Sequence, residues 1–394
     1  MNRKMVSQIL SRRGEVDSFI AMDMMSRAQT LEQAGRHVVH LEVGQPGFAA
    51  PRVVREAAIR AIGEKVLGYT EALGIMPLRE AISRHYADLY GLDVDPARIA
   101  VTTGSSGGFL LAFLATLDAG SGVLLPTPHY PAYRNMLKAL DLEPVIWPLE
   151  EAEGWQPDVA GLERMVSAAG VPVGALLLAS PSNPAGTVVP PDRLQALAEA
   201  CDRLGIRLIS DEIYHRLTYC AEARTALACS PDAIVVNSFS KYYCMTGWRI
   251  GWMVVPADLI RTVERLAQNF YISAPAVSQV AATAAFQATG ELEEVRAIYA
   301  DNRRLLLREL PGIGFDRMLP ADGAFYLYCD IGRLTDDSAQ LCLSMLEEAG
   351  VASTPGLDFD PVRGNRFVRF SFAGTREDIM SALDRLAAWT PARG

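Results

Sequence analysis

Short apolar runs recur between residues 99 and 236, and stretches with helical spacing separate them. The runs carry almost no charge, which is typical of strands buried on both faces of a sheet. They cover residues 99–103, 122–126, 174–179, 206–210 and 233–236. Because strands that alternate with helices form parallel sheets through crossover connections, the pattern predicts an α/β fold with a mainly parallel sheet flanked by helices.

The composition excludes several classes of protein. The formal net charge of −9 argues against a general binder of nucleic acid or of anionic membranes. The six cysteines form no C-x-x-C pair, so neither a metal site nor a disulfide framework is expected. The first 13 residues lack the apolar core of a signal peptide, and the longest uncharged stretch, 266–290, contains too many polar residues for a membrane span. A cytoplasmic protein with reduced thiols is therefore expected.

One lysine stands out among the four in the chain, which are Lys4, Lys65, Lys138 and Lys241. Lys241 follows the apolar run at 233–236, with Ser238 and Ser240 before it and Arg249 after it. A lysine near another cation and apolar neighbours tends to have a lowered pKa, which makes it a usable amine nucleophile. Such amines form Schiff bases with carbonyl compounds and with pyridoxal phosphate, whose phosphate the serines and Arg249 would suit. The alternative is an ordinary solvated loop lysine.

A glycine- and serine-rich stretch, Gly104-Ser105-Ser106-Gly107-Gly108, connects the run at 99–103 to a helix expected over 109–117. A strand, a small-residue loop and a helix start in this order present free backbone N–H groups to an anion. The stretch also fits the G-x-S-x-G nucleophile elbow of α/β-hydrolases. That alternative requires a histidine late in the chain, and only His129 and His215 follow Ser106. An anion site or a simple tight turn is therefore favoured.

Polar and aromatic residues follow the ends of other expected strands, where α/β sheets bind their ligands. Tyr130 could stack on a flat heterocycle, and Asp211 could pair with a ring nitrogen while Tyr214 reaches a neighbouring oxygen. Asn183 lies between two prolines at the end of the run at 174–179. Each residue also has an ordinary explanation, because Tyr130 could be packing, Asn183 part of a turn and Asp211 a turn cap.

Together these stretches resemble the class I and II aminotransferases, the fold-type I family of pyridoxal-phosphate enzymes that includes aspartate aminotransferase. The most specific motif is Ser238-Phe-Ser-Lys with Gly247-Trp-Arg-Ile-Gly. Ser180-Pro-Ser-Asn-Pro-Ala-Gly and Ser210-Asp-Glu-Ile-Tyr support it. The resemblance extends over almost the whole chain, from Val43-Gly-Gln-Pro-Gly to Val368-Arg-Phe-Ser-Phe.

The resemblance implies a large cofactor-binding domain and a smaller α+β domain. It places the N-terminal segment of the small domain at residues 1–44, the large domain at 45–290, and the rest of the small domain at 291–394. A long charged helix over 291–310 would leave the large domain. The small domain would contain strands near 323–328 and 367–372.

The resemblance also assigns roles around pyridoxal phosphate. Lys241 would form the Schiff base and move the proton between the substrate Cα and the cofactor C4′. Asp211 would pair with the pyridine N–H, so that the ring remains an electron sink. Asn183 and Tyr214 would hydrogen-bond the 3-oxygen, and Tyr130 would stack on the ring. The phosphate would be bound by Ser105, Ser106, Ser238, Ser240 and Arg249.

On the substrate side, the resemblance assigns the α-carboxylate to Arg369, with the backbone N–H of Gly44 and the side chain of Asn183 beside it. Phe325 would line the substrate pocket. Tyr69 matches a family tyrosine that reaches the phosphate of the partner subunit, which implies a homodimer with shared active sites. No residue clearly supplies a second arginine for a dicarboxylic substrate.

The predicted function is a homodimeric aminotransferase of amino-acid metabolism that moves an amino group between an L-amino acid and a 2-oxo acid. A ping-pong mechanism is expected, with glutamate and 2-oxoglutarate as one substrate pair. A β-elimination C–S lyase on the same scaffold stays open, because both reactions use the same residues. A non-catalytic ligand-sensing module is a third alternative, although every catalytic position is kept and no helix-turn-helix extension precedes the domain.

Overall fold

The computed structural model describes residues 11–64 and 66–389. Its largest sheet has seven strands in the order β2-β8-β7-β6-β5-β3-β4. The strands are β2 (Ile99–Thr102), β3 (Gly122–Thr127), β4 (Glu143–Pro148), β5 (Val173–Ala179), β6 (Arg207–Asp211), β7 (Ile234–Ser238) and β8 (Gly251–Val254). Only β8 runs against the direction of the others, pairing antiparallel with both β2 and β7. The predicted α/β fold with a mainly parallel sheet is confirmed.

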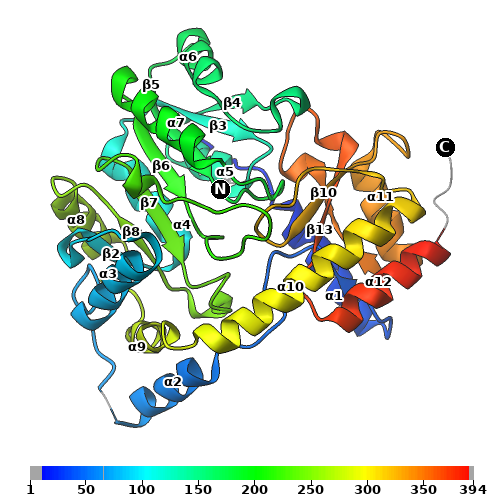
Figure 1. Ribbon diagram of the computed structural model, residues 1–394, viewed down its shortest axis with the longest axis horizontal. Helices are drawn as coiled ribbons and strands as arrows, with labels where there is room; N and C mark the ends of the chain where they lie inside the picture. The colour runs from blue at the N-terminus through cyan, green and yellow to red at the C-terminus, as the bar shows by residue number, and fades with distance from the viewer. Residues whose placement is uncertain (1–10, 65, 390–394) are drawn as a thin grey trace, which may run out of the picture.

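Helices cover both faces of this sheet (Figure 1). One face packs against α4 (Gly104–Thr116), α5 (Ala132–Ala139) and α8 (Ile260–Phe270). The other packs against α3 (Met76–Tyr90), α6 (Val159–Ala168), α7 (Pro191–Leu204) and α9 (Ala276–Ala285), and α2 (Arg52–Glu64) lies against α9. Neighbouring strand residues serve opposite faces, since Leu177 belongs to the first core and Leu176 and Leu178 to the second. Burial on both sides explains why the strands read as continuous apolar runs.

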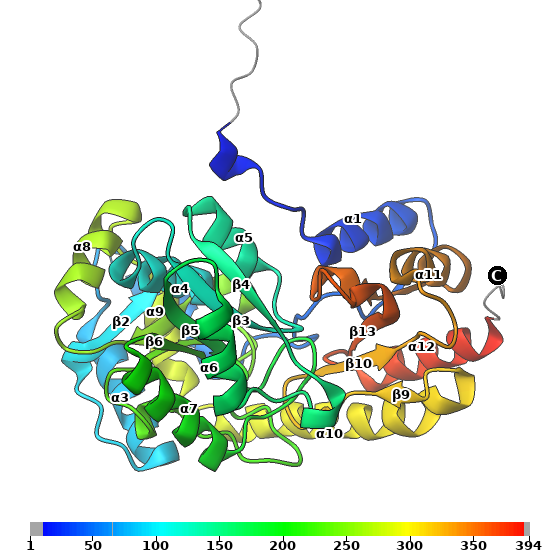
Figure 2. The same ribbon diagram turned by 90° about the horizontal axis from the view of Figure 1, so that it is seen from above.

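A second group of elements forms two smaller sheets. A four-stranded sheet has the order β12-β13-β10-β9, and β1 pairs with β11. These strands are β1 (Val39–His40), β9 (Arg317–Met318), β10 (Tyr326–Asp330), β11 (Val351–Ala352), β12 (Thr354–Pro355) and β13 (Phe367–Ser371). The helices around them are α1 (Ile20–Gln33), α10 (Thr289–Glu309), α11 (Ser338–Ser344) and α12 (Arg376–Ala388). Arg27 of α1 pairs with Glu347, shortly after α11, and Figure 2 shows α1 next to this group, so an N-terminal helix packs with elements from the last quarter of the chain.

The predicted division into residues 1–44, 45–290 and 291–394 stays a proposal. The distribution of strands supports it, because the seven-stranded sheet uses residues 99–254 and the smaller sheets use residues 39–40 and 317–371. Within the residues that the structure describes, no helix is long and apolar enough to cross a membrane.

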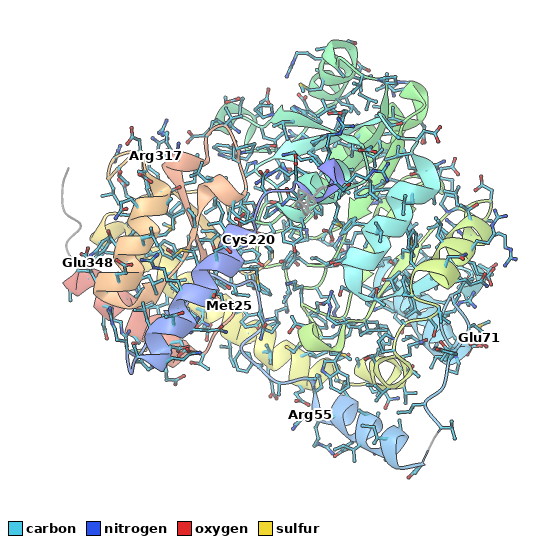
Figure 3. The ribbon with its side chains drawn as sticks, turned by 180° about the vertical axis from the view of Figure 1, so that it is seen from behind. Met25, Arg55, Glu71, Cys220, Arg317 and Glu348 are labelled. Atoms are coloured by element: carbon cyan, nitrogen blue, oxygen red, sulfur yellow. The ribbon has the colours of Figure 1, made fainter. Side chains whose placement is uncertain are left out.

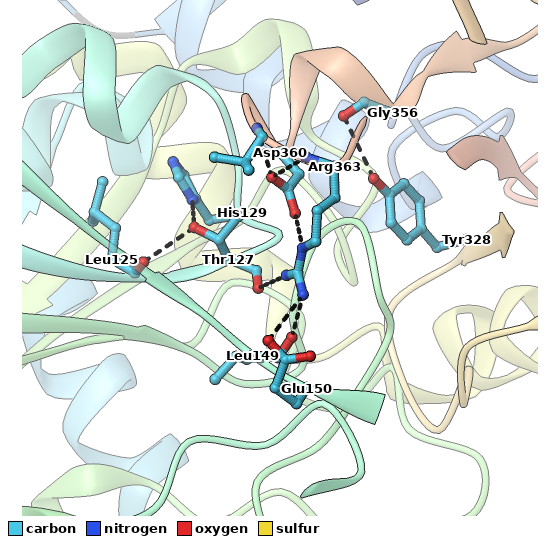
Figure 4. Close-up of polar contacts among 10 residues, drawn as sticks. Leu125, Thr127, His129, Leu149, Glu150, Tyr328, Gly356, Asp360 and Arg363 are labelled. Atoms are coloured by element: carbon cyan, nitrogen blue, oxygen red, sulfur yellow. Dashed lines mark hydrogen bonds and ion pairs between the residues drawn. The ribbon is translucent and has the colours of Figure 1, made fainter. Parts of the chain in front are cut away.

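Arg363 connects the two groups of elements (Figure 4). Its guanidinium donates to the carbonyl oxygens of Leu149 (2.9 Å) and Thr127 (3.4 Å), which follow or end strands of the large sheet. It also pairs with the buried carboxylate of Asp360 at 3.1 Å. The backbone N–H of His129 donates to the carbonyl of Phe359 at 3.0 Å. These bonds fix the segment after β12 against the carboxyl ends of β3 and β4.

The glycine- and serine-rich stretch differs from its prediction. It forms the first turn of α4, which begins at Gly104 rather than at residue 109. Glycine is tolerated in this helix because it packs close to the sheet: a Cβ on Gly108 would lie 2.9 Å from Cγ1 of Val236 in β7. The N–H groups of Ser105 and Ser106 are therefore helix N-terminal groups rather than loop groups.

Candidate active site

A cavity of about 220 Å³ lies at the carboxyl ends of β5, β6 and β7, next to the smaller sheets. Of the residues singled out from the sequence, eleven line it: Gly44, Ser105, Ser106, Tyr130, Asn183, Asp211, Tyr214, Ser240, Lys241, Arg249 and Arg369. They come from seven separate segments of the chain, and the topology of the fold brings them together. The cavity is therefore the candidate active site.

Lys241 follows β7 and points its amine across the cavity. Its Nζ donates to the carbonyl oxygen of Gly44 at 2.6 Å and lies 5.8 Å from the ring centre of Tyr214. Burial lowers the pKa of Lys241 to about 8, and the positive charges of Arg369 and Arg249 act in the same direction, while Asp211 opposes them. At pH 7 about a tenth of the amine is therefore uncharged, far more than for an ordinary lysine, and a nucleophile or base requires the uncharged form.

Asp211 is the last residue of β6, and its side chain is only 3 % exposed. The hydroxyl of Tyr133 donates to Oδ2, and the N–H of Ile213 donates to Oδ1 at 3.1 Å. Burial raises the pKa of Asp211 to about 6, whereas the two hydrogen bonds and Lys241 lower it. A buried carboxylate of this kind is stabilised when a cationic or N–H partner lies opposite it.

The hydrogen bond from Tyr133 predicts a pH effect. We expect Tyr133→Phe to raise the pKa of Asp211, because a donor to the ionised form is lost. A hydrogen bond to a charged group contributes about 1.5–3 kcal/mol, which corresponds to about 1–2 pH units. Ionised Asp211 is lost as the pH falls through its pKa, so the acid limb of kcat/KM should move to higher pH.

The control for this experiment is Tyr328→Phe. Tyr328 is equally buried, but its hydroxyl donates to the carbonyl of Gly356 at 3.4 Å and does not touch Asp211. Its pH profile should match that of the unmodified protein. An unchanged acid limb in Tyr133→Phe would remove Tyr133 from this role.

Arg369 lies in the middle of β13 and is 2 % exposed. Its guanidinium carbon lies 4.3 Å from the ring centre of Tyr326 and 4.6 Å from that of Phe359. Nη1 donates to Oδ1 of Asn183 at 2.9 Å, and Nη2 donates to the carbonyl of Glu42. Among the described residues Nε has no hydrogen-bond partner, so this buried cation keeps a free donor. No carboxylate of the described residues forms an ion pair with Arg369, so its guanidinium can bind the carboxylate of a substrate.

The other end of the cavity fits a phosphate. The first turn of α4 supplies the N–H groups and hydroxyls of Ser105 and Ser106, and the guanidinium of Arg249 lies against the same turn. A Cβ on Gly104 would lie 2.5 Å from Nη2 of Arg249, so glycine is needed for this close approach. Together with Asp211, Lys241 and Arg369 in the same lining, these residues match the donors and acceptors of pyridoxal phosphate and of an amino-acid carboxylate.

Three predicted residues lie outside the lining. Ser238 is 2 % exposed and hydrogen-bonds Oγ of Ser240 at 2.8 Å, so it supports a lining residue from behind. Phe325 does not line the cavity, because it is fully buried with its ring 5.4 Å from that of Tyr214. The next residue, Tyr326, lines the cavity instead, and its hydroxyl lies 2.7 Å from that of Tyr214. A Cβ on Gly44 would collide with the same hydroxyl.

Tyr69 is the third predicted residue outside the lining of the cavity, and it is 84 % exposed. It belongs to the segment between α2 and α3, whose residue Glu71 lies at the edge of the molecule in Figure 3, far from Met25 of α1. Within one chain, Tyr69 therefore takes no part in the cavity.

Several lining residues were not predicted from the sequence. Tyr133 follows Tyr130 by three residues at the start of α5, and this helical spacing could have indicated that both face one site. Phe19 and Met22, at the start of α1, also line the cavity. No local signal marks them, since they reach the site through long-range contacts.

Comparisons with known proteins agree with this geometry. The family model described as aminotransferase class I and II matches residues 36–386. A valine–pyruvate aminotransferase from Mycobacterium tuberculosis is 47 % identical over 393 residues, covering 99 % of this chain and 100 % of the relative. A crystal structure of an aminotransferase from the same species superposes with a TM-score of 0.94 at 46 % identity, covering 98 % and 100 % of the two chains. Aspartate aminotransferase from Thermus thermophilus, solved with maleate, gives 0.91 at 31 % identity, covering 97 % and 100 %.

Proposed function

Because the chain belongs to the class I and II aminotransferase family, we propose that it transfers the amino group of an apolar L-amino acid to a 2-oxo acid such as pyruvate. The cofactor of this family is pyridoxal phosphate, and the lining of the cavity fits it. The observation that carries the proposal is a cavity whose lining combines the residues of an aminotransferase site with an apolar wall near α1, where the substrate side chain would lie. The roles of individual residues below are part of the proposal.

The residues would hold the cofactor at three places. Arg249 and the first turn of α4 would bind the phosphate, Asp211 would face the ring nitrogen, and Tyr130 would lie against the ring. When bound, pyridoxal phosphate supplies an electron sink that weakens the bonds at the substrate Cα. An ionised Asp211 keeps the ring nitrogen protonated, which strengthens that sink.

Arg369 and Lys241 would act on the substrate. Arg369 would bind the α-carboxylate and thereby orient the Cα–H bond toward Nζ of Lys241. The uncharged amine of Lys241 would accept the proton from the substrate Cα and then donate it to the cofactor C4′. The carbonyl of Gly44, which accepts from Nζ at 2.6 Å, would hold the amine once the substrate has displaced it from the cofactor. A single carboxylate anchor serves the amino acid and the 2-oxo acid equally, as a ping-pong cycle requires.

The lining also bears on the substrate side chain. Its described cations are Lys241, Arg249 and Arg369, and each already has a proposed partner. The remaining wall near α1 is formed largely by Phe19, Met22 and Val43, with Phe19 edge-on to Tyr130 at 5.6 Å. Such a wall favours an apolar side chain over a carboxylate. The name of the relative from Mycobacterium tuberculosis, valine–pyruvate aminotransferase, supports the same pairing.

A panel of half-reactions tests this proposal. The holoenzyme is mixed with valine, alanine, aspartate or glutamate, the change in cofactor absorbance is followed, and the 2-oxo acid is identified. The return reaction is run with pyruvate and with 2-oxoglutarate. We expect valine or alanine and pyruvate to have the highest kcat/KM. A preference for glutamate and 2-oxoglutarate would restore the pair predicted from the sequence.

The same assay distinguishes the lyase alternative. A C–S lyase would release pyruvate and ammonia from cysteine-like substrates without any 2-oxo acid acceptor. We expect no such release, together with parallel lines when donor and acceptor are varied in steady-state kinetics. Ammonia release at a rate comparable with transamination would move the function to elimination.

We further propose a cytoplasmic homodimer with shared active sites. Large apolar side chains are exposed on α2, on the segment that follows it, and at and just after the end of α8: Ile59, Ile62, Val66, Tyr69, Phe270 and Ile272. Apolar side chains that are exposed in this way support a surface that binds the partner subunit. All six cysteines are free thiols, which supports a reducing compartment.

Mixed dimers test the sharing of sites. Tyr69→Phe should weaken cofactor binding by about 1.5–3 kcal/mol, because one hydrogen bond to the phosphate of the partner subunit is lost. Mixing Tyr69→Phe chains with Lys241→Ala chains should create heterodimers in which one site carries both changes and the other carries neither. Cofactor affinity and activity of the intact site should then return. If mixtures never exceed the sum of the two parents, the sites are not shared.

A further inference from the structure

We propose that a second cavity, between α3, the end of α9 and the start of α10, binds a small organic carboxylate with an apolar body. This cavity has a volume of about 460 Å³ and shares no lining residue with the active site. Figure 1 shows α3, α9 and the first turns of α10 together, below the large sheet. The proposal does not depend on which amino acid the enzyme uses.

A buried histidine faces this cavity without a partner. His85 of α3 is 9 % exposed and lines the cavity, and no hydrogen bond to its ring occurs within residues 11–64 and 66–389. Burial and the charge of Arg216 lower the pKa of His85 to about 4, so the ring is neutral at physiological pH. A neutral imidazole carries one N–H donor, and no ring nitrogen of His85 is among the fully buried atoms without a partner in the described residues, so this donor is accessible from the cavity. A ligand with an acceptor oxygen would satisfy it.

The surroundings of His85 are positive. Arg84 and Arg216 line the cavity, and Asp88 is the one acidic residue of its described lining. Arg216 pairs with Glu293 at 3.0 Å, but Glu293 also accepts from Nε of Arg296 at 2.6 Å, so one carboxylate serves two guanidinium groups. Thr289, the first residue of α10, is part of the lining as well.

The apolar walls select among anions. Phe286 packs against His85 with ring centres 5.3 Å apart, and Ala81 and Leu89 complete the apolar part of the lining. A compact dianion such as phosphate would leave these walls unused and would be repelled by Asp88. A singly charged carboxylate attached to a flat apolar group would meet the arginines with one end and the aromatic wall with the other.

The cavity lies close to the catalytic lysine. The guanidinium carbon of Arg216 lies 4.2 Å from the ring centre of Tyr242, the residue that follows Lys241. The hydroxyl of Tyr242 donates to Glu293 at 2.6 Å, so Arg216, Tyr242 and Glu293 form one contact group. A carboxylate that engages Arg216 would compete with Glu293 and would therefore act on the neighbour of Lys241.

Histidine NMR on the holoenzyme tests the proposal, with benzoate as the probe. The chain has five histidines, so a sample labelled at histidine Cε1 gives few signals, and His85→Gln assigns the one of interest. His129 serves as an internal reporter of the active site, because its ring stacks on that of Tyr133. We expect benzoate to shift the His85 signal in a saturable manner with a Kd of about 1 mM or lower, and inorganic phosphate to leave it unmoved.

Matched variants locate the binding. Arg84→Gln, an exposed position on α3, should weaken the effect of benzoate on His85 about tenfold, and Arg216→Gln should do the same. Arg164→Gln, an exposed arginine on α6, is the control and should change nothing. The proposal is overturned if only the His129 signal responds to benzoate, if phosphate shifts His85 equally, or if both cavity variants bind as Arg164→Gln does.

Discussion

Lys241→Ala is expected to abolish transamination, with a loss of about 10⁴-fold or more in kcat. Two contributions disappear at once, because Lys241 is proposed both to hold the cofactor and to carry the proton. General acid–base catalysis alone contributes about 10²–10⁴-fold, and loss of a covalent attachment point adds to this. No other amine lines the cavity within the described residues, so no neighbour can replace Nζ.

The location of the attached cofactor is measured separately from turnover. Borohydride treatment of the holoenzyme, followed by peptide mapping, should place the cofactor on Lys241 and leave Lys241→Ala unlabelled. Lys138→Ala is the matched control, because Lys138 lies on the surface with Nζ 3.1 Å from Oδ2 of Asp17. That variant should keep both label and rate. A label on Lys138, or on Lys4 or Lys65, which lie outside the described residues, would contradict the assignment.

The fold and most of the cavity could be predicted from the sequence because their signals are local. Strands buried on both faces must be apolar throughout, and β5 therefore stands out as an unbroken apolar run. The residue that follows or ends such a strand lies at the sheet edge where ligands bind, which is how Asp211 and Asn183 were found. The α/β class, the aminotransferase family and its cofactor are confirmed.

What the sequence missed depends on long-range contacts. Phe19 and Met22 reach the cavity because α1 is fixed by Asp358, whose carboxylate accepts from the N–H groups of Ile20 and Ala21, both at 3.1 Å. No pattern near residue 20 indicates a cap that comes from residue 358. The prediction named Phe325, whereas Tyr326 lines the cavity, for a different reason. Neighbouring residues near the start of β10 face opposite ways, so an error of one position exchanges the ring that lines the cavity for one that does not, although both rings are buried.

A second large loss of rate is expected for Asp211→Asn. The carboxylate of Asp211 is buried, and this burial raises its pKa to about 6, which disfavours its charge. The proposed ring N–H supplies the missing partner, and the ionised carboxylate in turn keeps that nitrogen protonated. Asparagine is nearly the same size but carries no charge, so the ring nitrogen would lose its proton and the electron sink would weaken.

The size of the loss follows from the energy of a broken buried pair. Removing one member of a buried charge pair costs about 3–5 kcal/mol, and each 1.36 kcal/mol is a factor of about ten, so kcat/KM should fall by about 10²–10⁴-fold. The cofactor should remain bound, because the phosphate contacts of Arg249 and α4 are unchanged. Absorbance after gel filtration checks binding, and stopped-flow half-reactions measure the rate.

The neighbouring Glu212 provides the control that separates chemistry from folding. It is fully buried, and its Oε1 accepts from the N–H of Ala226 (2.8 Å) and from the hydroxyls of Thr225 and Ser210 (both 3.1 Å). Glutamine keeps an acceptor there, so Glu212→Gln should shift Tm while kcat/KM stays within a few-fold.

The pH profile adds a second criterion. The rate of the unmodified enzyme should fall as the pH drops through the pKa of Asp211, and Asp211→Asn should lack that limb because it has no carboxyl to titrate. Equal losses in both variants, or an acid limb that persists in Asp211→Asn, would show that another group controls the ring nitrogen.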